Sequence, residues 1–501
     1  MDKRHSLLLV TVDCLRADHV GFMGYGRPTT PFLDCLAAES MVFPHAIVGG
    51  APTYYSLPSV LASRHPLALG RDVIGIAPGE PTLASVLKEF GYETAAFVAA
   101  NPYLSPSFGY EQGFDNFRDF LDADSPVTSS NGASGNGGLK FRNRINSSLR
   151  KISSQWRLAE AAYEELYFQY CQRMATPRSD SLDALRCFPA ADVLVDQASA
   201  WLELVGRKPF FLWLHLMDPH SPYYPTENAL ARMGHSEVTP FRARYLNSYW
   251  NRSDLSAKRF NRHRENIVTL YDASIRWVDT QVARLVNTLI RFHQWRDCVF
   301  AFTADHGEEF LDHEGRYHPP SKLSEEIVRA PLLVRVPQQA KFELPSAPFS
   351  HLHLAPTLLD ILKLPIPTEF EGHSVWHHLK EGSAWDEPAI VESVGNCTNP
   401  FHADARVGPR LLAVRETRYK LILDFDRPAE QLFDLEADPR ERTPLPLDAE
   451  KRTGRRLLEH ARRHLARPLH VQYPHLRLRA RLRDLQIKSA KTVRQSVSAC
   501  G

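Results

Sequence analysis

The stretch FAFTADHGEEFLDHEGRYH, residues 300–318, begins as an apolar run and continues into acids and histidines. A continuous apolar run is typical of a strand that is buried on both faces, as in a parallel sheet covered by helices. This run ends in Asp305 and His306, which stand side by side. Because ligands bind outside the carboxyl ends of the strands in an open α/β sheet, both side chains are candidates for a functional site.

Other apolar runs along the chain resemble this one. They are SLLLVTVD (6–13), ETAAFVAA (93–100), PFFLWLHLMD (209–218) and APLLVRVP (330–337). Helical patterns lie between them, at TPFLDCLAAES (30–40), TLASVLKEFG (82–91) and YDASIRWVDTQVARLVNTLIRFH (271–293). Strand and helix alternate, so we predict an α/β sandwich in which a mostly parallel central sheet carries helices on both faces.

The chain divides into three expected regions: a main domain (1–385), a small antiparallel C-terminal subdomain (386–445) and a basic, partly helical tail (446–501). A Gly/Ser/Asn cluster at 129–140 opens a polar, helical insertion at about 125–195. Strand-like runs at 411–426 and 431–439 indicate the subdomain. The arginine pairs of the tail could touch nucleic acid or an anionic membrane, but without an aromatic stacking pattern we expect a solvated face.

The composition indicates an ordinary globular protein. The 501 residues are 43% hydrophobic and 24% charged, with a net charge of +2, which excludes a fibre or a disordered chain. The 7 cysteines include no CxxC pair, so we expect reduced thiols rather than a disulfide framework or a zinc knuckle. The N-terminal apolar run leads into an acid rather than a cleavage site, and no run approaches the ~18 residues of a membrane span. We therefore expect a cytoplasmic protein.

Polar, ligand-type side chains follow three of the predicted strands. The first strand ends at Asp13, the central one carries His215 and leads to Asp218 and His220, and the last ends at Asp305 and His306. Carboxylate and imidazole groups that meet at one edge suit calcium, magnesium, manganese or zinc. Taken singly, an Asp after a strand is often a helix N-cap, and a histidine within an apolar strand is more often a core residue.

At this point the sequence resembles the sulfatase family of the alkaline phosphatase superfamily. The blocks that carry the resemblance follow one another in family order: LLLVTVDCLRADHVGFMGYGRPTTPFLDCLAAESMVFPHAI, FFLWLHLMDPHSPYYP, FTADHGEEFLDHEG, EEIVRAPLLVRVP, HLAPTLLDILKLPIP with FEGHSVWHHL, RYKLILDFD, and QLFDLEADPRE. The resemblance covers most of the chain. It implies the alkaline-phosphatase-like fold, ester hydrolysis and a divalent metal held by Asp13, Asp305 and His306.

The resemblance also locates a nucleophile. SVLASRHP (59–66) is similar to the end of the family's signature block, and counting back from it places Thr53 where the family has a Cys or Ser that becomes formylglycine. This residue is therefore expected both to attack the substrate and to contact the metal. Ser56 is the competing hydroxyl. A helix N-cap is the structural alternative for Thr53, and it is compatible with a nucleophile because a helix N-terminus favours a bound anion.

Several positions depart from the family pattern. Leu57 stands at the signature arginine and Cys14 at the second acid of the paired Asp block. Asn101 lies nearest to the missing Lys-x-His pair, while His318 and Lys322 are nearest to the family's later lysine. The resemblance thus implies a retained metal site and an altered substrate cradle, for which Asn101, His318, Lys322 and His220 are the candidate binding residues.

A threonine cannot become formylglycine, but its hydroxyl, bound to a metal, can attack a tetrahedral phosphorus in line. His220, with His318, would hydrogen-bond the transferring group or protonate the leaving oxygen. We expect one ion, calcium or alternatively zinc, manganese or magnesium. A second ion held by Asp218, His220 and His313 is the less favoured alternative.

These residues predict a sulfatase-like, metal-dependent hydrolase of sulfate or phosphate (phosphonate) esters. The alternatives are a phosphoryl-type transferase of the same superfamily and a non-catalytic protein that uses the pocket to bind an anion. The expected partner is a small anionic ester, with no nucleic acid and no transmembrane segment.

Overall fold

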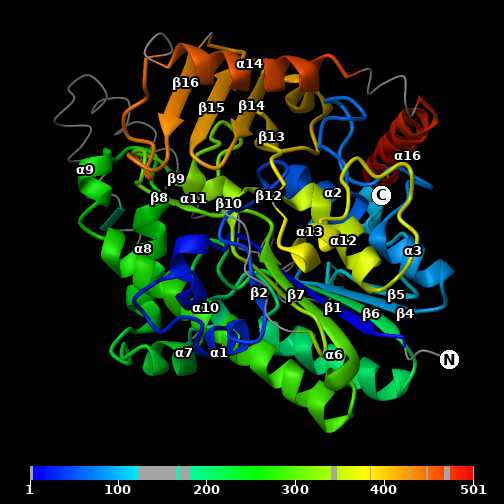
Figure 1. Ribbon diagram of the computed structural model, residues 1–501. Coiled ribbons are helices and arrows are strands. Elements are labelled where there is room, and N and C mark those ends of the chain that lie inside the picture. Colours follow the sequence, from blue (N-terminus) through cyan, green and yellow to red (C-terminus); the bar gives the residue numbers. More distant parts are fainter. Residues whose placement is uncertain are drawn as a thin grey trace.

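A seven-stranded central sheet organises the computed structural model (Figure 1). The structure describes residues 4–121, 165, 168–169, 181–339, 347–383, 385–427, 429–446, 450–467 and 474–499. In spatial order the strands of the sheet are β2 (Met41–Val42), β11 (Leu332–Arg335), β7 (Cys298–Ala304), β1 (Ser6–Val12), β6 (Phe210–Leu216), β4 (Glu93–Val98) and β5 (Asn116–Arg118).

The five strands from β7 to β5 run parallel, while β11 and β2 are antiparallel to their neighbours. In the register of the sheet Val12 of β1 lies opposite Leu216 of β6 and Ala304 of β7. The residues that follow these strands therefore leave the sheet at one common edge. This register is what brings segments some 300 residues apart in sequence to the same place.

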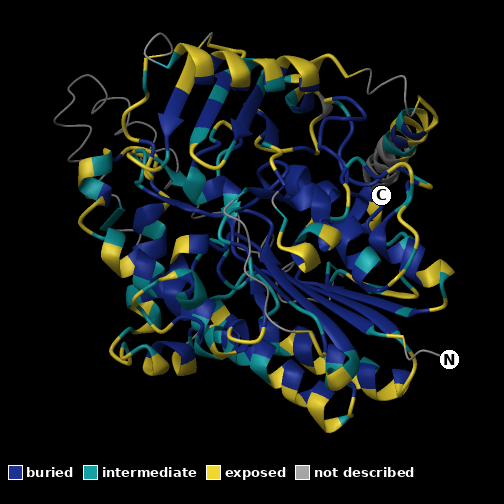
Figure 2. Cartoon of the chain, viewed as in Figure 1, coloured by how far each residue is buried: buried dark blue, intermediate teal, exposed yellow. Residues whose placement is uncertain are grey.

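Both faces of the sheet are buried, which explains why the strands are apolar throughout (Figure 2). Leu8, Val10 and Val12 point into one core, and Leu7 and Leu9 point into the other. The first core is closed by helices α1 (Pro31–Ala37), α6 (Ala191–Val205), α7 (Glu227–Arg232), α8 (Pro240–Trp250), α9 (Ala257–Phe260), α10 (Arg264–Arg291) and α11 (Glu325–Val328). The second is closed by α2 (Thr53–Ala62), α3 (Leu83–Glu89), α12 (Leu354–Ile361) and α13 (Trp376–Glu381). The predicted α/β sandwich is confirmed.

A second, antiparallel sheet follows in the C-terminal part of the chain. Its strands are β13 (Ala389–Val394), β14 (Arg410–Arg415), β15 (Tyr419–Asp424) and β16 (Ala429–Asp434), in that order. Helix α14 (Lys451–Leu465) lies across this sheet and buries Leu457 and Ala461 against it (Figure 1). The predicted small antiparallel C-terminal sheet is confirmed, although β13 was not recognised in the sequence.

Two short sheets and a terminal helix complete the described chain. They are β10 (Arg329–Ala330) with β3 (Ala46–Ile47) and β12 (Phe349–Ser350), β8 (Glu309–Phe310) with β9 (Arg316–Tyr317), and α16 (Pro474–Ala499). Leu476 and Ala480 of α16 pack against Leu69 and Val73 of the main domain. Most of the predicted insertion at 125–195 lies outside the described residues. No helix within the described ranges is both long and apolar enough to cross a membrane.

Candidate active site

The carboxyl edge of the sheet gathers Asp13 from the end of β1 with Asp305 and His306 from the end of β7. All three side chains are fully buried. His306 Nε2 lies 3.5 Å from Asp305 Oδ2 and 3.9 Å from Asp13 Oδ1. One ligand atom of each residue lies within 4.8 Å of the others, which is the spacing needed to share one cation. The structure therefore brings the three predicted metal ligands together.

Thr53 faces this group from the first turn of α2. Its Oγ1 lies 3.4 Å from Asp13 Oδ2 and 3.2 Å from His306 Nε2. The N-cap of the helix is Pro52, and no side chain caps it, so the alternative that Thr53 is the N-cap is wrong. The competing hydroxyl, Ser56, donates instead to the backbone carbonyl of Asp305, at 2.5 Å. Of the two hydroxyls, only Thr53 contacts the side chains of the cluster.

The orientation of His306 suits a metal ligand. Its Nδ1 lies 2.8 Å from the carbonyl oxygen of Gly307, which can only accept a hydrogen bond. Nδ1 therefore carries the ring hydrogen when the imidazole is neutral, and the lone pair of Nε2 points at Thr53 and the two aspartates. A backbone contact of this kind on the far nitrogen is the usual device for orienting a histidine toward a cation.

Asp13 is held by an amide and an imidazole. The amide nitrogen of Asn101 donates to Asp13 Oδ2 at 3.0 Å, and His215 Nε2 lies 3.4 Å from the same oxygen. His215 also contacts Thr11 Oγ1 through Nδ1, at 2.9 Å, so it is a buried core histidine that at the same time positions Asp13. Burial alone would raise the pKa of Asp13, but the imidazoles of His220, His215 and His306 hold it well below its usual range.

The negative charge of Asp305 is less well compensated than that of Asp13. Its Oδ1 accepts from the backbone N–H of Cys14 at 3.2 Å and of His306 at 2.7 Å. Its Oδ2 has no hydrogen-bond partner in the described part of the chain. Burial, and then the charge of Asp13, raise the pKa of Asp305. Two buried carboxylates, one of them with an oxygen that accepts no hydrogen bond, thus lie beside an imidazole lone pair. This set of donor atoms fits a divalent cation.

A second layer lies next to this cluster. His318 Nδ1 is 3.2 Å from Cys14 Sγ and 3.4 Å from Glu308 Oε1. The His318 ring lies 4.6 Å from the His306 ring and 5.1 Å from the His220 ring, measured between centroids. Burial opposes it, but Glu308 and the two aspartates raise the pKa of His318. His220 donates through Nδ1 to the Ser221 carbonyl at 2.5 Å, which leaves its Nε2 available.

Other residues from the sequence-based hypotheses lie in separate networks. Lys322 Nζ pairs with Glu309 at 2.7 Å and donates to the His313 carbonyl at 3.0 Å, and its binding of substrate stays a prediction. Asp218 accepts from the backbone N–H of Ala191 at the start of α6, and burial raises its pKa to about 6. His313 Nδ1 contacts Glu326 at 2.8 Å. Because Asp218 and His313 belong to these different networks, they do not support a shared second metal.

Sequence reasoning missed Glu308 and the exact place of Asn101. Glu308 is fully buried and lies behind His318, with Oε2 lacking a hydrogen-bond partner among the described residues. The one signal for Glu308 in the sequence was its position two residues after the Asp305-His306 pair. Asn101 was expected to bind substrate, whereas its amide donates to Asp13. The structure thus gives Asn101 a role in positioning the carboxylate, and its binding of substrate stays a prediction.

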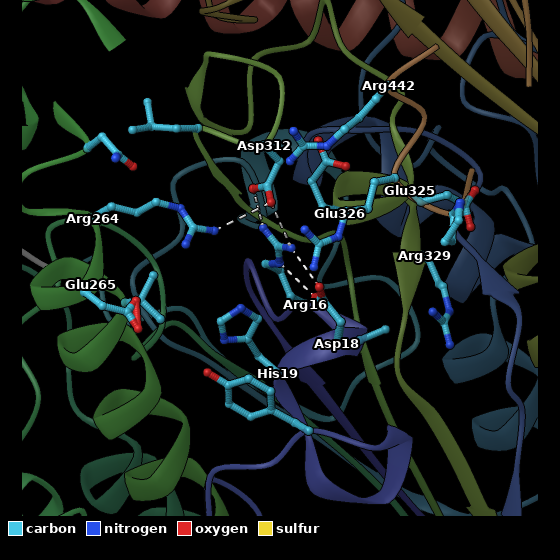
Figure 3. Close-up of a pocket in the computed structure, with 17 residues that line it drawn as sticks. Arg16, Asp18, His19, Arg264, Glu265, Asp312, Glu325, Glu326, Arg329 and Arg442 are labelled. Carbon is cyan, nitrogen blue, oxygen red and sulfur yellow. Dashed lines mark hydrogen bonds and ion pairs between the residues drawn. The ribbon is translucent and has the colours of Figure 1, made fainter. Parts of the chain in front are cut away.

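A cavity of about 770 Å³ is lined by Arg16 and by several further charged side chains (Figure 3). Arg16 is three residues beyond Asp13, and its guanidinium lies 2.8 Å from Asp18 and 2.7 Å from Asp312. It also donates to the Glu308 carbonyl at 3.0 Å, so it forms part of the boundary between the two regions. The lining includes Arg264, Arg329 and Arg442 as well. We call this cavity the arginine pocket.

The chain belongs to the sulfatase family. Residues 5–364 match the family named Sulfatase, and residues 314–467 match N-sulphoglucosamine sulphohydrolase, C-terminal. The predicted family resemblance is thereby confirmed over both the main domain and the antiparallel sheet. The matched ranges contain Asp13, Thr53, Asp305, His306 and His318.

Two curated relatives and one solved structure illustrate the similarity. Arylsulfatase K of Rattus norvegicus is 26% identical over 277 residues, 50% of this chain and 48% of the relative, so the chain spans about half the length of that protein. Arylsulfatase of Clostridium perfringens is 23% identical over 484 residues, 88% of this chain and 90% of the relative. The phosphonate monoester hydrolase of Agrobacterium radiobacter has a TM-score of 0.64 at 20% identity, covering 94% of this chain and 96% of that one. This last likeness shows the shared fold.

Proposed function

We propose that the protein is a metal-dependent hydrolase of small sulfate or phosphate (phosphonate) esters that uses Thr53 as its nucleophile. The observation that carries the proposal is the position of the Thr53 hydroxyl, 3.2 Å from His306 Nε2 and 3.4 Å from Asp13 Oδ2 in a fully buried cluster. A threonine that only supports the first turn of a helix does not require contacts with two metal-ligand side chains, such as Asp13 and His306, from distant strands.

The cation site would be built from Asp13, Asp305, His306 and the hydroxyl of Thr53. A bound divalent cation would lower the pKa of the hydroxyl and neutralise negative charge that develops on the transferring group. The chain itself contributes the orientation. Asn101 and His215 fix Asp13, and the backbone N–H groups of Cys14 and His306 fix Asp305.

Thr53 Oγ1 would form a bond to phosphorus while the ester oxygen departs, which gives a phosphoryl-enzyme at Thr53 and a free alcohol. The hydroxyl proton leaves to solvent as this bond forms, and the departing oxygen takes a proton from His220 or His318, which regains one from solvent. Water then opens the phosphoryl-enzyme and restores the threonine. Thr53 starts α2, so the partial positive charge at the helix N-terminus favours the bound anion.

The choice between sulfur and phosphorus depends on the chemistry of residue 53. A formylglycine hydrate can expel sulfate by re-forming its aldehyde, whereas a threonine ester has no such exit and must be hydrolysed. Phosphoryl-enzymes are opened by this route when water attacks the phosphorus. We therefore propose a preference for phosphate or phosphonate esters over sulfate esters.

The test is turnover of a panel of aryl sulfates, phosphate monoesters, phosphodiesters and phosphonate esters, with and without added Zn²⁺, Mn²⁺, Mg²⁺ or Ca²⁺. Wild type is compared with Thr53→Ala and with Thr53→Ser, which keeps the hydroxyl. We expect a phosphorus ester to be turned over, the Ala variant to lose activity and the Ser variant to retain part of it. Full activity of the Ala variant, or a preference for sulfate, would overturn the assignment of the nucleophile or of the substrate.

Two alternatives give different results in the same assay. A transferase would pass the phosphoryl group to an added alcohol faster than to water. A non-catalytic binding protein would turn over none of the esters with any of the metals. The close approach of Thr53 to Asp13 and His306 favours a hydrolase or transferase over simple binding.

A further inference from the structure

Cys14 lies among the proposed metal ligands. Its side chain is fully buried, with Sγ 3.0 Å from Asp13 Oδ1 and 3.2 Å from His318 Nδ1. It shares one group of ligand atoms within 4.8 Å with His306 and His318, and another with Asp13 and His220. A sulfur atom thus lies inside the same small volume as the carboxylates and imidazoles of the site.

The backbone holds Cys14 in this position against a conformational cost. Its φ of 59° lies in the left-handed region, which non-glycine residues seldom adopt and which costs about 1 kcal/mol or more. The turn is fixed on both sides. The backbone N–H of Cys14 donates to Asp305 Oδ1 at 3.2 Å, and the hydroxyl of Tyr271 donates to the Cys14 carbonyl at 2.7 Å. A turn fixed in this way directs Sγ toward Asp13.

A second observation points to a ligand at the same place. Asp305 Oδ2 is buried and has no hydrogen-bond partner among the residues that the structure describes. The carboxylates of Asp13 and Asp305 are also without a lysine or arginine partner in that part of the chain, because their ion pairs are with His215 and His306. The cluster therefore has donor atoms and negative charge that an added cation would satisfy.

We propose that Cys14 is a thiolate ligand of the metal at this site, and that it makes the site selective for a borderline transition-metal ion, Zn²⁺ foremost, over Ca²⁺ and Mg²⁺. The inference rests on the metal site of the proposed function. On coordination the sulfur–metal bond replaces the S–H bond, and the proton leaves to solvent past the partly exposed His318. Thiolate ligands favour zinc and similar ions, whereas calcium and magnesium take oxygen ligands almost exclusively.

Cobalt tests this directly because a thiolate bound to Co²⁺ gives an intense near-ultraviolet charge-transfer absorption that oxygen and nitrogen ligands do not give. The full-length metal-free protein is loaded with one equivalent of Co²⁺, and its spectrum is compared with those of Cys14→Ser and Cys14→Asp. We expect the band in the wild type and its loss in both variants. Aspartate tolerates a positive φ better than most residues, so Cys14→Asp keeps the turn. Cys35→Ser, which removes an exposed thiol on α1, is the matched control and keeps the band.

Competition between Zn²⁺ and Ca²⁺ in equilibrium dialysis measures the selectivity. We expect Cys14→Asp to shift the preference toward Ca²⁺ by about 10- to 100-fold, the usual effect of altering a metal's surroundings. Co²⁺ bound by the wild type without the charge-transfer band, or an unchanged preference in Cys14→Asp, would overturn the role of Cys14 while leaving the proposed hydrolysis intact. A band with no ester turnover would instead refute the proposed function and support the thiolate. No binding of Co²⁺ at all would overturn both.

Discussion

Arg16 links the arginine pocket, which it lines, to the Glu308 carbonyl beside the candidate active site, and both regions contain clusters of carboxylates. In the arginine pocket each carboxylate has a cationic partner. Asp18 and Asp312 pair with Arg16 (Figure 3). Glu265 pairs with Arg27, Glu325 with Lys420 and Glu326 with His313. Arg16 holds the pKa of both Asp18 and Asp312 below the usual range, against the effect of burial.

In the candidate active site the corresponding partners are imidazoles, an amide, a thiol and backbone N–H groups. Asp13, Asp305 and Glu308 are fully buried, and their ion pairs within the described ranges are with histidines alone. The pKa of Asp305 is raised rather than lowered. The difference teaches that the fold supplies its own cations to one region, whereas in the other region the proposed metal would supply the missing positive charge.

The largest expected effect is a difference in kcat/KM between variants of the two regions. Thr53→Ala should lower kcat/KM for the best phosphorus ester by about 10⁴-fold or more, because it removes the attacking oxygen. Arg442→Ala, in the arginine pocket, should change the same quantity by less than about 3-fold, since this residue lies outside the reacting groups. Steady-state kinetics on both variants checks the comparison. Equal losses would show that the arginine pocket takes part in the reaction.

His220→Asn should lower kcat by about 100-fold, the usual contribution of a general acid. The loss should be larger for esters with a poorly leaving alcohol than for nitrophenyl esters, because only the former need the proton. Kinetics across a series of leaving groups makes the measurement. The matched change in the arginine pocket is His19→Asn, which breaks a 2.7 Å contact with Asp272 and should leave the leaving-group dependence unaltered. If His220→Asn lowers kcat equally for all leaving groups, His220 is not the general acid.

The two regions should also differ in stability when metal is removed. With EDTA present, Asp312→Asn should lower the free energy of unfolding by about 2 kcal/mol, because it leaves the buried Arg16 with one carboxylate fewer. Asp305→Asn should leave the stability of the metal-free protein unchanged or raised by about 1 kcal/mol, since it removes a buried charge without a cationic partner. Urea unfolding of each variant measures both values. A marked destabilisation of metal-free Asp305→Asn would contradict the view that this charge awaits a cation.

The smallest effect concerns pH and the arginine pocket. The hydrogen bond to Glu326 is the main reason why the pKa of His313 is raised to about 9, although burial opposes it. A raised histidine pKa means that the stabilisation is complete below the unfolded value of about 6.5 and is lost as the pH rises through about 9. His313→Gln should therefore cost about 1–2 kcal/mol at pH 6, after allowance for its partial exposure, and almost nothing above pH ~10. A cost that does not change with pH would show that the contact is not an ion pair.

Much of the fold and part of the site could be predicted from the sequence. The apolar runs that end at Asp13 and Asp305 lie in β1 and β7, and their parallel register places both aspartates at one edge. Periodicity and parallel pairing are enough for that inference. The strand β13 was not predicted because AIVESV is short and because Glu392 and Ser393 interrupt its apolar run without giving an alternating pattern.

The finer features of the site depend on contacts between distant segments, which one sequence does not reveal. Asn101 was predicted to bind substrate, and in the structure its amide donates to Asp13. Lys322 was a candidate for substrate binding, and its ammonium pairs with Glu309. The direction of a side chain at the end of a strand follows from the turn that comes next, such as the left-handed turn at Cys14.

Isolation of the covalent intermediate tests the central claim most directly. Wild-type enzyme is mixed with a phosphorus ester that it turns over, quenched in acid within one turnover and digested for peptide mass spectrometry. We predict a phosphoryl group on Thr53 that disappears when the substrate is exhausted and does not form in Thr53→Ala. Hydrolysis that proceeds with no modified Thr53, or with the group on Ser56, would contradict the assignment of Thr53 as the nucleophile beside the metal.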